Sequence, residues 1–255
     1  MLVFKNDSDY LDQHFLMDED VINKFIKICD LNSSDVVLEI GPGKGTLTKL
    51  IASRVKRVYA IEKDVRLKEY LNKIDNLEVI YDDAIRCDYP LVNKIITAIP
   101  YSIIEPFMYK LCHTSFDSLY MIMGSTYVKS VINKEVNNLA LLTNCFFDVK
   151  WYFDVPRECF YPEPKTLSSV IKLTPKKDYK PLELLFKNMY LLDDKKIKNA
   201  LMESLIKVKG LTKRESKELI SNLNISDELL DKKFLSISNQ ELKELYAKLN
   251  SLHVN

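Results

Sequence analysis

The sequence predicts an α/β fold built on a parallel sheet, followed by a small all-helical domain. Three observations carry this prediction. Strand-like and helix-like apolar patterns alternate over about 120 residues, which is typical of a parallel sheet with helices on both faces. A glycine-rich loop follows the first long apolar run. From about residue 178 the strand pattern ends and helical periodicity alone continues. We therefore expect two domains, at 1–177 and 178–255.

The first domain is expected to alternate its elements in order. Residues 19–30 place apolar side chains at helical spacing. Short apolar runs then predict strands at 35–40, 57–64, 77–84, 94–100 and 118–124. Helices are expected at 46–54, 67–74 and 102–113, and, with a break, over 128–147. A late pair of strands, 149–156 and 168–175, is typical of an antiparallel edge. In the second domain we expect helices at 181–192, 195–208, 212–223 and 239–252.

Composition and charge describe an ordinary globular protein, with 47% hydrophobic and 29% charged residues. The net charge of +1 excludes a global attraction to nucleic acid, so any RNA-binding surface must be local. The five cysteines include no Cys-x-x-Cys pair and the three histidines form no ligand pattern, so we expect reduced thiols and no metal site. The chain shows no signal peptide and no membrane-spanning run, and we expect a cytoplasmic protein.

Three of the five glycines fall in one loop, GPGKG, at Gly41, Gly43 and Gly45. The loop lies between a predicted strand and a predicted helix, where a ligand can approach the main chain. A dinucleotide fingerprint needs G-x-G-x-x-G, and here the third glycine comes one residue early. Glu39, just before the loop, repels a pyrophosphate but suits a cation. The pattern therefore favours S-adenosylmethionine, which carries an ammonium and a sulfonium group, over NAD.

Two further carboxylates follow the next two strands. Glu62 lies at the end of the second strand, where a carboxylate accepts hydrogen bonds from ribose hydroxyls. Asp83 lies at the end of the third, where it can accept from an adenine amine. Each acid alone is more often a solvated loop residue. Three acids at three successive strand ends indicate a ligand site, because ligands bind at the carboxyl edge of such sheets.

Six motifs then occur in one order: QHFL (13–16), EIGPGKG (39–45), AIEKD (60–64), YDDA (81–84), AIPY (98–101) and FYPEPKTLSS (160–169). In this order they resemble the ribosomal RNA adenine N6,N6-dimethyltransferases of archaeal type, relatives of the Erm enzymes. The resemblance covers about residues 10–175 and extends more weakly to 233–242. It implies a Rossmann-like class I S-adenosylmethionine-dependent methyltransferase domain with a small C-terminal helical domain that contacts ribosomal RNA. The implied partner is small-subunit ribosomal RNA or the small subunit, and we expect a monomer.

The resemblance also assigns roles to residues. The N-terminal motif is implied to close over the cofactor, Gly41 to line its methionine part, Glu62 to bind the ribose and Asp83 the adenine. The predicted cofactor-binding set is Gln13, His14, Leu16, Glu39, Gly41, Gly43, Glu62, Asp83 and Ala98. On the substrate side, the Pro100 carbonyl accepts an amine hydrogen, Tyr101 stacks on a flipped base and Phe160 lines the pocket opposite. The predicted catalytic set is Ala98, Pro100, Tyr101 and Phe160.

The chain departs from the family at two of these positions. His14 stands where the family usually has Asn, and Ala98 stands where it has an Asn whose carbonyl accepts an amine hydrogen. Removing one such acceptor typically lowers the rate by about 10²–10³. Hydroxyls of Thr97 and Ser102 flank the gap.

Three alternatives to adenine N6 methylation remain open from the sequence. The same fold can act on another RNA atom that needs no such acceptor. Alternatively, the chain is an assembly factor of the ribosome that binds the cofactor but is catalytically impaired. A small-molecule methyltransferase is disfavoured by the added helical domain and its basic clusters.

Overall fold

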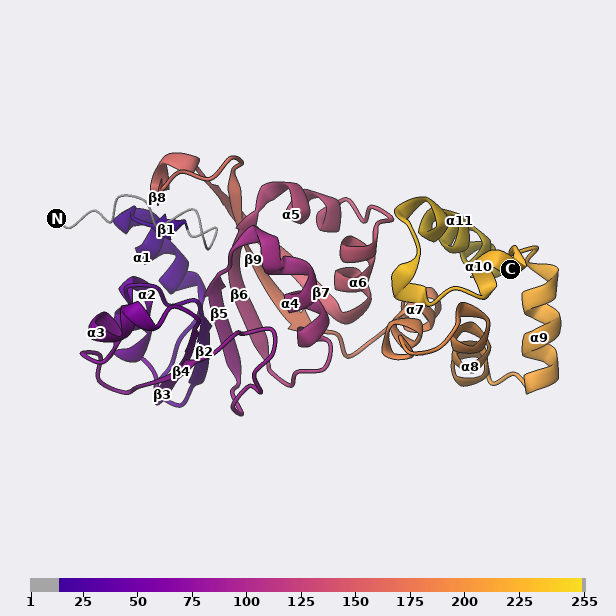
Figure 1. Ribbon diagram of the computed structural model, residues 1–255, viewed down its shortest axis with the longest axis horizontal. Helices are drawn as coiled ribbons and strands as arrows, with labels where there is room; N and C mark the ends of the chain where they lie inside the picture. The colour runs from indigo at the N-terminus through magenta and orange to yellow at the C-terminus, as the bar shows by residue number, and fades with distance from the viewer. Residues whose placement is uncertain (1–13, 254–255) are drawn as a thin grey trace. The chain divides into compact units, whose positions relative to one another are not determined.

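The structure, a computed structural model, describes residues 14–253 (Figure 1). It divides into two compact units. The first unit comprises the described residues up to Ile132 together with Asp148–Pro175, and the second comprises Asn133–Phe147 together with the described residues from Lys176 onward. Within the described part of the chain, no helix is both long enough and apolar enough to cross a membrane.

A seven-stranded sheet forms the centre of the first unit. Its spatial order is β4 (Leu77–Tyr81), β3 (Arg57–Glu62), β2 (Val36–Ile40), β5 (Lys94–Ala98), β6 (Ser118–Gly124), β9 (Ser168–Pro175) and β7 (Phe147–Val155). The strands from β4 to β6 pair in parallel, and β9 pairs with β6 in the antiparallel direction. The predicted strands and the antiparallel late strand are thereby confirmed. The order reverses between β2 and β5, which is where open α/β sheets bind ligands.

Helices lie on both sides of this sheet. In Figure 1, α1 (Glu19–Ile28), α2 (Thr46–Ala52) and α3 (Lys68–Leu71) lie to one side, and α4 (Ile104–Leu111) and α5 (Ser125–Ile132) lie to the other. All seven residues of β6 are buried, as expected for a strand covered on both faces. The predicted helix at 67–74 is shorter in the structure, because only four residues follow the 3₁₀ turn at Val65–Leu67.

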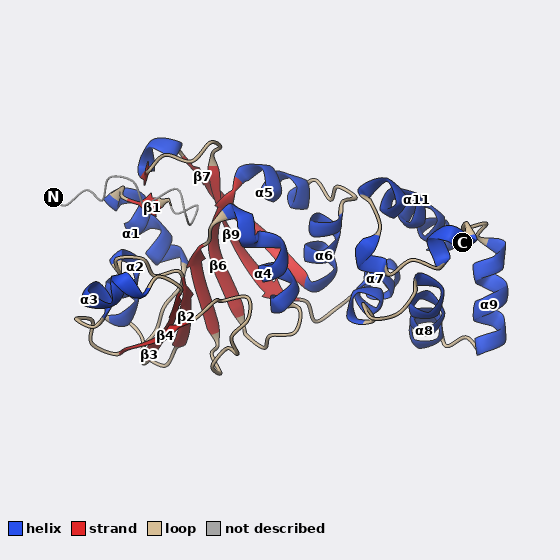
Figure 2. Ribbon diagram, in the orientation of Figure 1, coloured by secondary structure: helices blue, strands red, loops and turns tan. Residues whose placement is uncertain are grey.

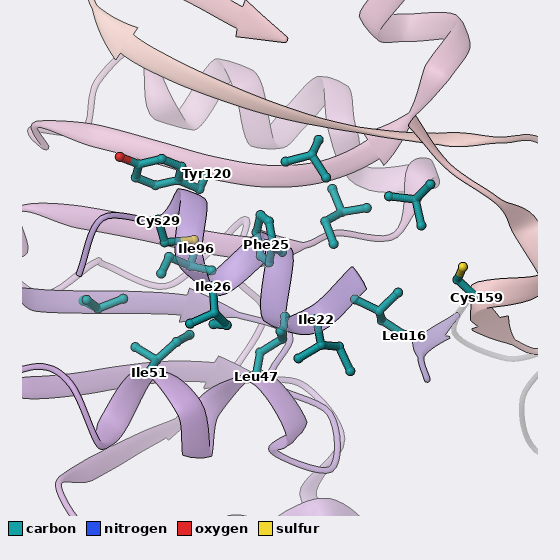
Figure 3. Close-up of a cluster of buried hydrophobic side chains, with 14 of the residues drawn as sticks. Leu16, Ile22, Phe25, Ile26, Cys29, Leu47, Ile51, Ile96, Tyr120 and Cys159 are labelled. Carbon is teal, nitrogen blue, oxygen red and sulfur yellow. The ribbon is translucent and has the colours of Figure 1, made fainter. Parts of the chain in front are cut away.

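The helix α1 shows how the sequence sets local structure and packing together. Asp18 caps it, since its carboxylate accepts the N–H of Val21 at 2.9 Å. The spacing of Ile22, Phe25 and Ile26 puts them on one buried face. Figure 3 shows that face packed against side chains of α2 and of the strands. Burying each such side chain stabilises the fold by about 1.5–3 kcal/mol.

A second, two-stranded sheet was not predicted. It pairs β1 (Phe15–Leu16) with β8 (Phe160–Tyr161) in the antiparallel direction, with Phe15 opposite Tyr161 and Leu16 opposite Phe160. The N–H of Met17 also donates to the carbonyl of Cys159 at 2.8 Å. This pairing brings the described part of the QHFL motif beside Phe160 and Tyr161 of the FYPEPK motif, although about 145 residues separate them.

The described residues of the second unit form helices and loops (Figure 2). The helices are α6 (Asn138–Phe146), α7 (Pro181–Leu191), α8 (Ile197–Lys209), α9 (Lys213–Asn222), α10 (Asp227–Leu230) and α11 (Asn239–Asn250). The four predicted C-terminal helices correspond to α7, α8, α9 and α11, and the short α10 was missed. Capping boxes start α9 and α11, at Thr212 with Glu215 and at Ser238 with Glu241.

Candidate active site

A cavity of about 410 Å³ lies over the carboxyl ends of β2, β3, β4 and β5. Its volume is within the ordinary range of small-molecule sites. Nine residues of the predicted set line it: His14, Gly41, Gly43, Glu62, Asp83, Ala98, Pro100, Tyr101 and Phe160. Leu16 and Glu39 do not line it, and Gln13 lies outside the described residues.

The glycine loop forms one wall of this cavity. Gly41, Gly43 and Gly45 have φ angles of +67°, +57° and +80°, a region that L side chains rarely adopt. A Cβ on Gly43 would stand 2.9 Å from Cε1 of Phe15, whereas a Cβ on Gly41 would meet no atom within 4 Å. Gly41 lines the cavity and has open space beside its main chain, which leaves room for a ligand to approach it.

Glu62 is held at the end of β3 by the glycine loop. Its side chain accepts the N–H of Gly43 at 3.1 Å and the N–H of Asp64 at 2.8 Å. The residue is only 3% exposed, and burial raises its pKa, although these two N–H groups oppose the shift. The carboxylate is thus fixed in orientation at the cavity wall, as a group that accepts ribose hydroxyls must be.

Asp83 lies two residues beyond β4 and in a different electrostatic setting. Its Oδ1 accepts the N–H of Ile85 at 2.9 Å, and its Oδ2 accepts the Lys63 ammonium at 3.2 Å. The Ile85 N–H, and then Lys63, lower the pKa of Asp83. The side chain therefore stays ionised and can accept a hydrogen bond from an amine in the cavity.

Glu39 is buried beneath the glycine loop. It is 2% exposed, and its Oε2 atom has no hydrogen-bond partner among the described residues. Burial raises its pKa to about 8, opposed by the Thr48 hydroxyl and reinforced by the charge of Glu62. Ile40 lines the cavity and Glu39 does not. Its proposed cofactor contact stays a prediction.

The end of β5 and the loop after it form another part of the lining. Ala98 presents only a methyl group there, and the carbonyl of Pro100 accepts the N–H of Ile103 at 3.3 Å, which leaves its second lone pair. Thr97 is fully buried, and its hydroxyl donates to the carbonyl of Ile40 at 2.9 Å. It is not among the lining residues, whereas the exposed Ser102 is.

Tyr101 is fixed within this part of the lining. Its hydroxyl shares a 2.5 Å hydrogen bond with that of the buried Ser168. Its ring packs on Gly124, where an added Cβ would stand 3.6 Å from the ring. Gly124 leaves room for the aromatic ring, and the ring orientation is set before any base arrives.

Several contributors were assigned no role from the sequence. Lys63 and Phe15 line the cavity. Lys110, in the last turn of α4, donates to the carbonyls of Ile85 at 3.2 Å and of Cys87. These hydrogen bonds stabilise the loop that carries Asp83. A lysine near a helix end looks in sequence like a solvated surface residue, so only the fold shows this contact.

The donor set fits an S-adenosylmethionine-sized group. Two carboxylates, Glu62 and Asp83, suit ribose hydroxyls and an adenine amine, and Gly41 in the same lining leaves space for a ligand beside the main chain. Apolar side chains such as Ile61 and Ile85 complete the lining. Among the described residues, no group of three or more His, Cys, Asp or Glu side chains is arranged to hold a metal ion.

Comparison with known proteins gives a consistent result. Residues 4–241 match the family model described as "Ribosomal RNA adenine dimethylase". The "Probable ribosomal RNA small subunit methyltransferase A" of Pyrococcus abyssi is 33% identical over 248 residues, covering 93% of this chain and 90% of that protein. The protein of the same name from Methanosphaera stadtmanae is 31% identical, covering 91% of this chain and 90% of that protein.

Solved structures show the same fold. A dimethyladenosine transferase from Plasmodium falciparum aligns with a TM-score of 0.63 at 23% identity, covering 93% of this chain and 98% of that one. The 23S rRNA methyltransferase ErmE aligns with a TM-score of 0.59 at 21% identity, covering 92% and 99%. The predicted fold class is confirmed.

Proposed function

The chain belongs to the ribosomal RNA adenine dimethylase family, and on this premise we propose that it transfers methyl groups from S-adenosylmethionine to the N6 amine of adenines in small-subunit ribosomal RNA. The observation that carries the proposal is one cavity with two unlike walls. Strand-end carboxylates and the glycine loop form the first wall, and the Pro100–Tyr101 loop with Phe160 forms the second.

The first wall is proposed to hold the cofactor. Glu62 accepts from the ribose, Asp83 accepts from the adenine amine, and Gly41 admits the chain that carries the sulfur. When bound, S-adenosylmethionine supplies a methyl group on a positively charged sulfur, which keeps the carbon–sulfur electron pair as the methyl leaves. The protein contributes by holding the cofactor in one orientation, because main-chain N–H groups already orient the carboxylates of Glu62 and Asp83.

The second wall is proposed to hold a base taken out of its stack. The ring of Tyr101, locked by Ser168, offers a flat surface worth about 1–3 kcal/mol per stacked base. Phe160 is buried and lines the same cavity. The carbonyl of Pro100 accepts one amine hydrogen, which helps to turn the nitrogen lone pair out of the ring plane.

The helical domain at 178–255 is proposed to contact ribosomal RNA. Lys213, Arg214 and Lys217 are exposed along α9 and offer a local basic surface on a chain of nearly neutral charge. We propose that the protein acts as a monomer on the small subunit, in the cytoplasm.

Transfer of labelled methyl groups tests the proposal. Small subunits that lack adenine methylation are incubated with the chain and labelled S-adenosylmethionine, with large subunits and Asp83→Asn as controls. The expected result is label in small-subunit RNA, reduced in the variant. Cofactor binding without any transfer would instead indicate an assembly factor that is catalytically impaired.

A further inference from the structure

Trp151 is the one tryptophan of the chain, and it lies on the edge strand of the large sheet. Its strand, β7, ends the sheet on the side away from β4 and is the neighbour of β9 (Figure 2). Apolar strand residues ordinarily pack in the core, yet Trp151 is 49% exposed. It does not line the cavity of the active site either. Neither core packing nor methyl transfer therefore accounts for this side chain.

Two hydrogen bonds hold the indole of Trp151 in one orientation. Its Nε1–H donates to Oδ1 of Asp154 at 3.2 Å, and the same oxygen accepts the hydroxyl of Ser169 at 2.5 Å. Ser169, on the neighbouring strand β9, is only 1% exposed. The carboxylate of Asp154 is thus anchored to the interior of the sheet and in turn orients the ring. An exposed ring that is already ordered loses little conformational entropy when a ligand stacks on it.

Two lysines present ammonium groups beside this part of β7. Lys150 directly precedes Trp151, and its Nζ lies 4.9 Å from the centroid of the Tyr152 ring. Nζ of Lys24, on α1, lies 3.7 Å from the centroid of the Phe153 ring, which is two residues or about 7 Å along the strand from the tryptophan. Both lysines are exposed, and neither forms an ion pair with another described residue. Both charges therefore remain available to an anion.

A fixed, exposed ring beside two cations fits single-stranded RNA better than it fits a protein. Unpaired bases stack on aromatic side chains, and lysines bind the phosphates beside them. A protein interface instead gathers several apolar side chains at its centre, whereas Trp151 is the one large apolar side chain of β7 that is exposed. Of the two acids of β7, Asp154 is engaged by the indole and by Ser169, and Asp148 lies three residues or about 10 Å away.

We propose that Trp151 stacks on an unpaired base of the substrate RNA while Lys24 and Lys150 bind the phosphates beside that base. The proposal rests on the proposed function and adds to it an RNA contact on the first unit, outside the cavity. Stacking and phosphate contacts at this place contribute to the affinity for RNA and do not touch the reacting atoms. The loss of Trp151 should therefore appear in the KM for small subunits.

The fluorescence of the one tryptophan tests the stacking directly, because it reports this position alone. The native chain is titrated with a single-stranded RNA oligonucleotide of small-subunit sequence, and with the same oligonucleotide paired to its complement. The expected result is quenching by the single strand over the concentration range in which it binds, and much weaker quenching by the duplex. Binding of the single strand without quenching would overturn the proposal.

Substitutions supply the second readout. Trp151→Ala should raise the Kd for the single strand about 5- to 150-fold, the loss of one stacked base, and Trp151→Phe, which keeps a ring, by much less. Lys24→Gln and Lys150→Gln should each reduce the slope of log Kd against log salt concentration by about 0.7. Leu91→Ala, which truncates an exposed apolar side chain outside the cavity, is the matched control, and thermal unfolding shows that each variant is folded.

The remaining outcomes separate this proposal from the proposed function. An unchanged Kd for Trp151→Ala would overturn the stacking role. Fluorescence that responds to a protein of the small subunit but not to RNA would overturn it too, and would assign the surface to protein docking. Loss of RNA affinity in Trp151→Ala, with no methyl transfer by the native chain, would support this RNA contact and remove the proposed function. Methyl transfer with the same RNA affinity in every variant would do the reverse.

Discussion

Replacing Gly41 by alanine separates the role of the glycine loop in binding from its role in folding. The loop residue has a φ of +67°, and a Cβ added there would meet no atom within 4 Å. Gly210, at the end of α8, has the same φ of +67° and the same empty surroundings, but it does not line the cavity. The two substitutions therefore impose the same backbone strain in different places.

The magnitudes follow from these geometries. Backbone strain from a non-glycine residue in the left-handed region lowers the free energy of unfolding by about 1–2 kcal/mol. Alanine also reduces the conformational entropy of the unfolded chain, which offsets about 0.4–1 kcal/mol of this loss. Each variant should thus lose about 1 kcal/mol, or roughly 2–4 °C in Tm. Of the two glycines only Gly41 lines the cavity, so only a Cβ at position 41 can meet a bound cofactor. A clash there that costs about 1–3 kcal/mol weakens cofactor binding about 5- to 150-fold.

Isothermal titration with S-adenosylmethionine and thermal unfolding measure both quantities on Gly41→Ala, Gly210→Ala and the native chain. The two variants should show similar Tm losses, and only Gly41→Ala should show a raised Kd. An unchanged Kd for Gly41→Ala would refute the reasoning, since the cofactor would then not approach this glycine. Equal loss of affinity in Gly210→Ala would refute it as well.

Three further predictions concern the groups beneath and beside the cavity. Because burial raises the pKa of Glu39 from 4.5 to about 8, the folded state keeps a proton that the unfolded chain releases, and this group lowers stability as the pH rises from 5 to 8. Glu39→Gln should remove this pH-dependent loss of stability. Urea unfolding of the native chain and the variant at pH 5 and at pH 8 measures the difference. Lys94→Met leaves the Asp35 carboxylate buried without the ammonium that lies 2.8 Å from it, and should lower the free energy of unfolding by about 3–5 kcal/mol. Lys110→Met removes the ammonium that donates to the carbonyl of Ile85, in the loop that carries Asp83. Losing about one charged hydrogen bond should raise the Kd for the cofactor about tenfold, which isothermal titration with S-adenosylmethionine measures.

Much of the fold could be predicted because its elements carry strong periodic patterns. The strand β6 is an unbroken apolar run, and α1 shows a clear helical face. The sheet formed by β1 and β8 has two residues in each strand, too few for any period to be read. The four-residue α10 was missed for the same reason.

The site was predictable where function depends on position along a strand. Glu62 and Asp83 follow from strand ends that meet at one edge of the sheet. The same rule included Glu39, which the structure buries outside the cavity lining. The hydrogen bond from His14 to Pro162 joins residues 148 positions apart and could not be inferred from local sequence.

The central claim is that this cavity presents the N6 amine of an adenine for methylation. Mass spectrometry of nucleosides from small-subunit RNA, after incubation with the native chain and S-adenosylmethionine, tests it most directly. The account predicts N6-methylated adenosines, including the dimethylated form, with no gain in other methylated nucleosides. A methyl group on a ring nitrogen or a ribose, or no new methylated nucleoside from a chain that binds the cofactor, would contradict it.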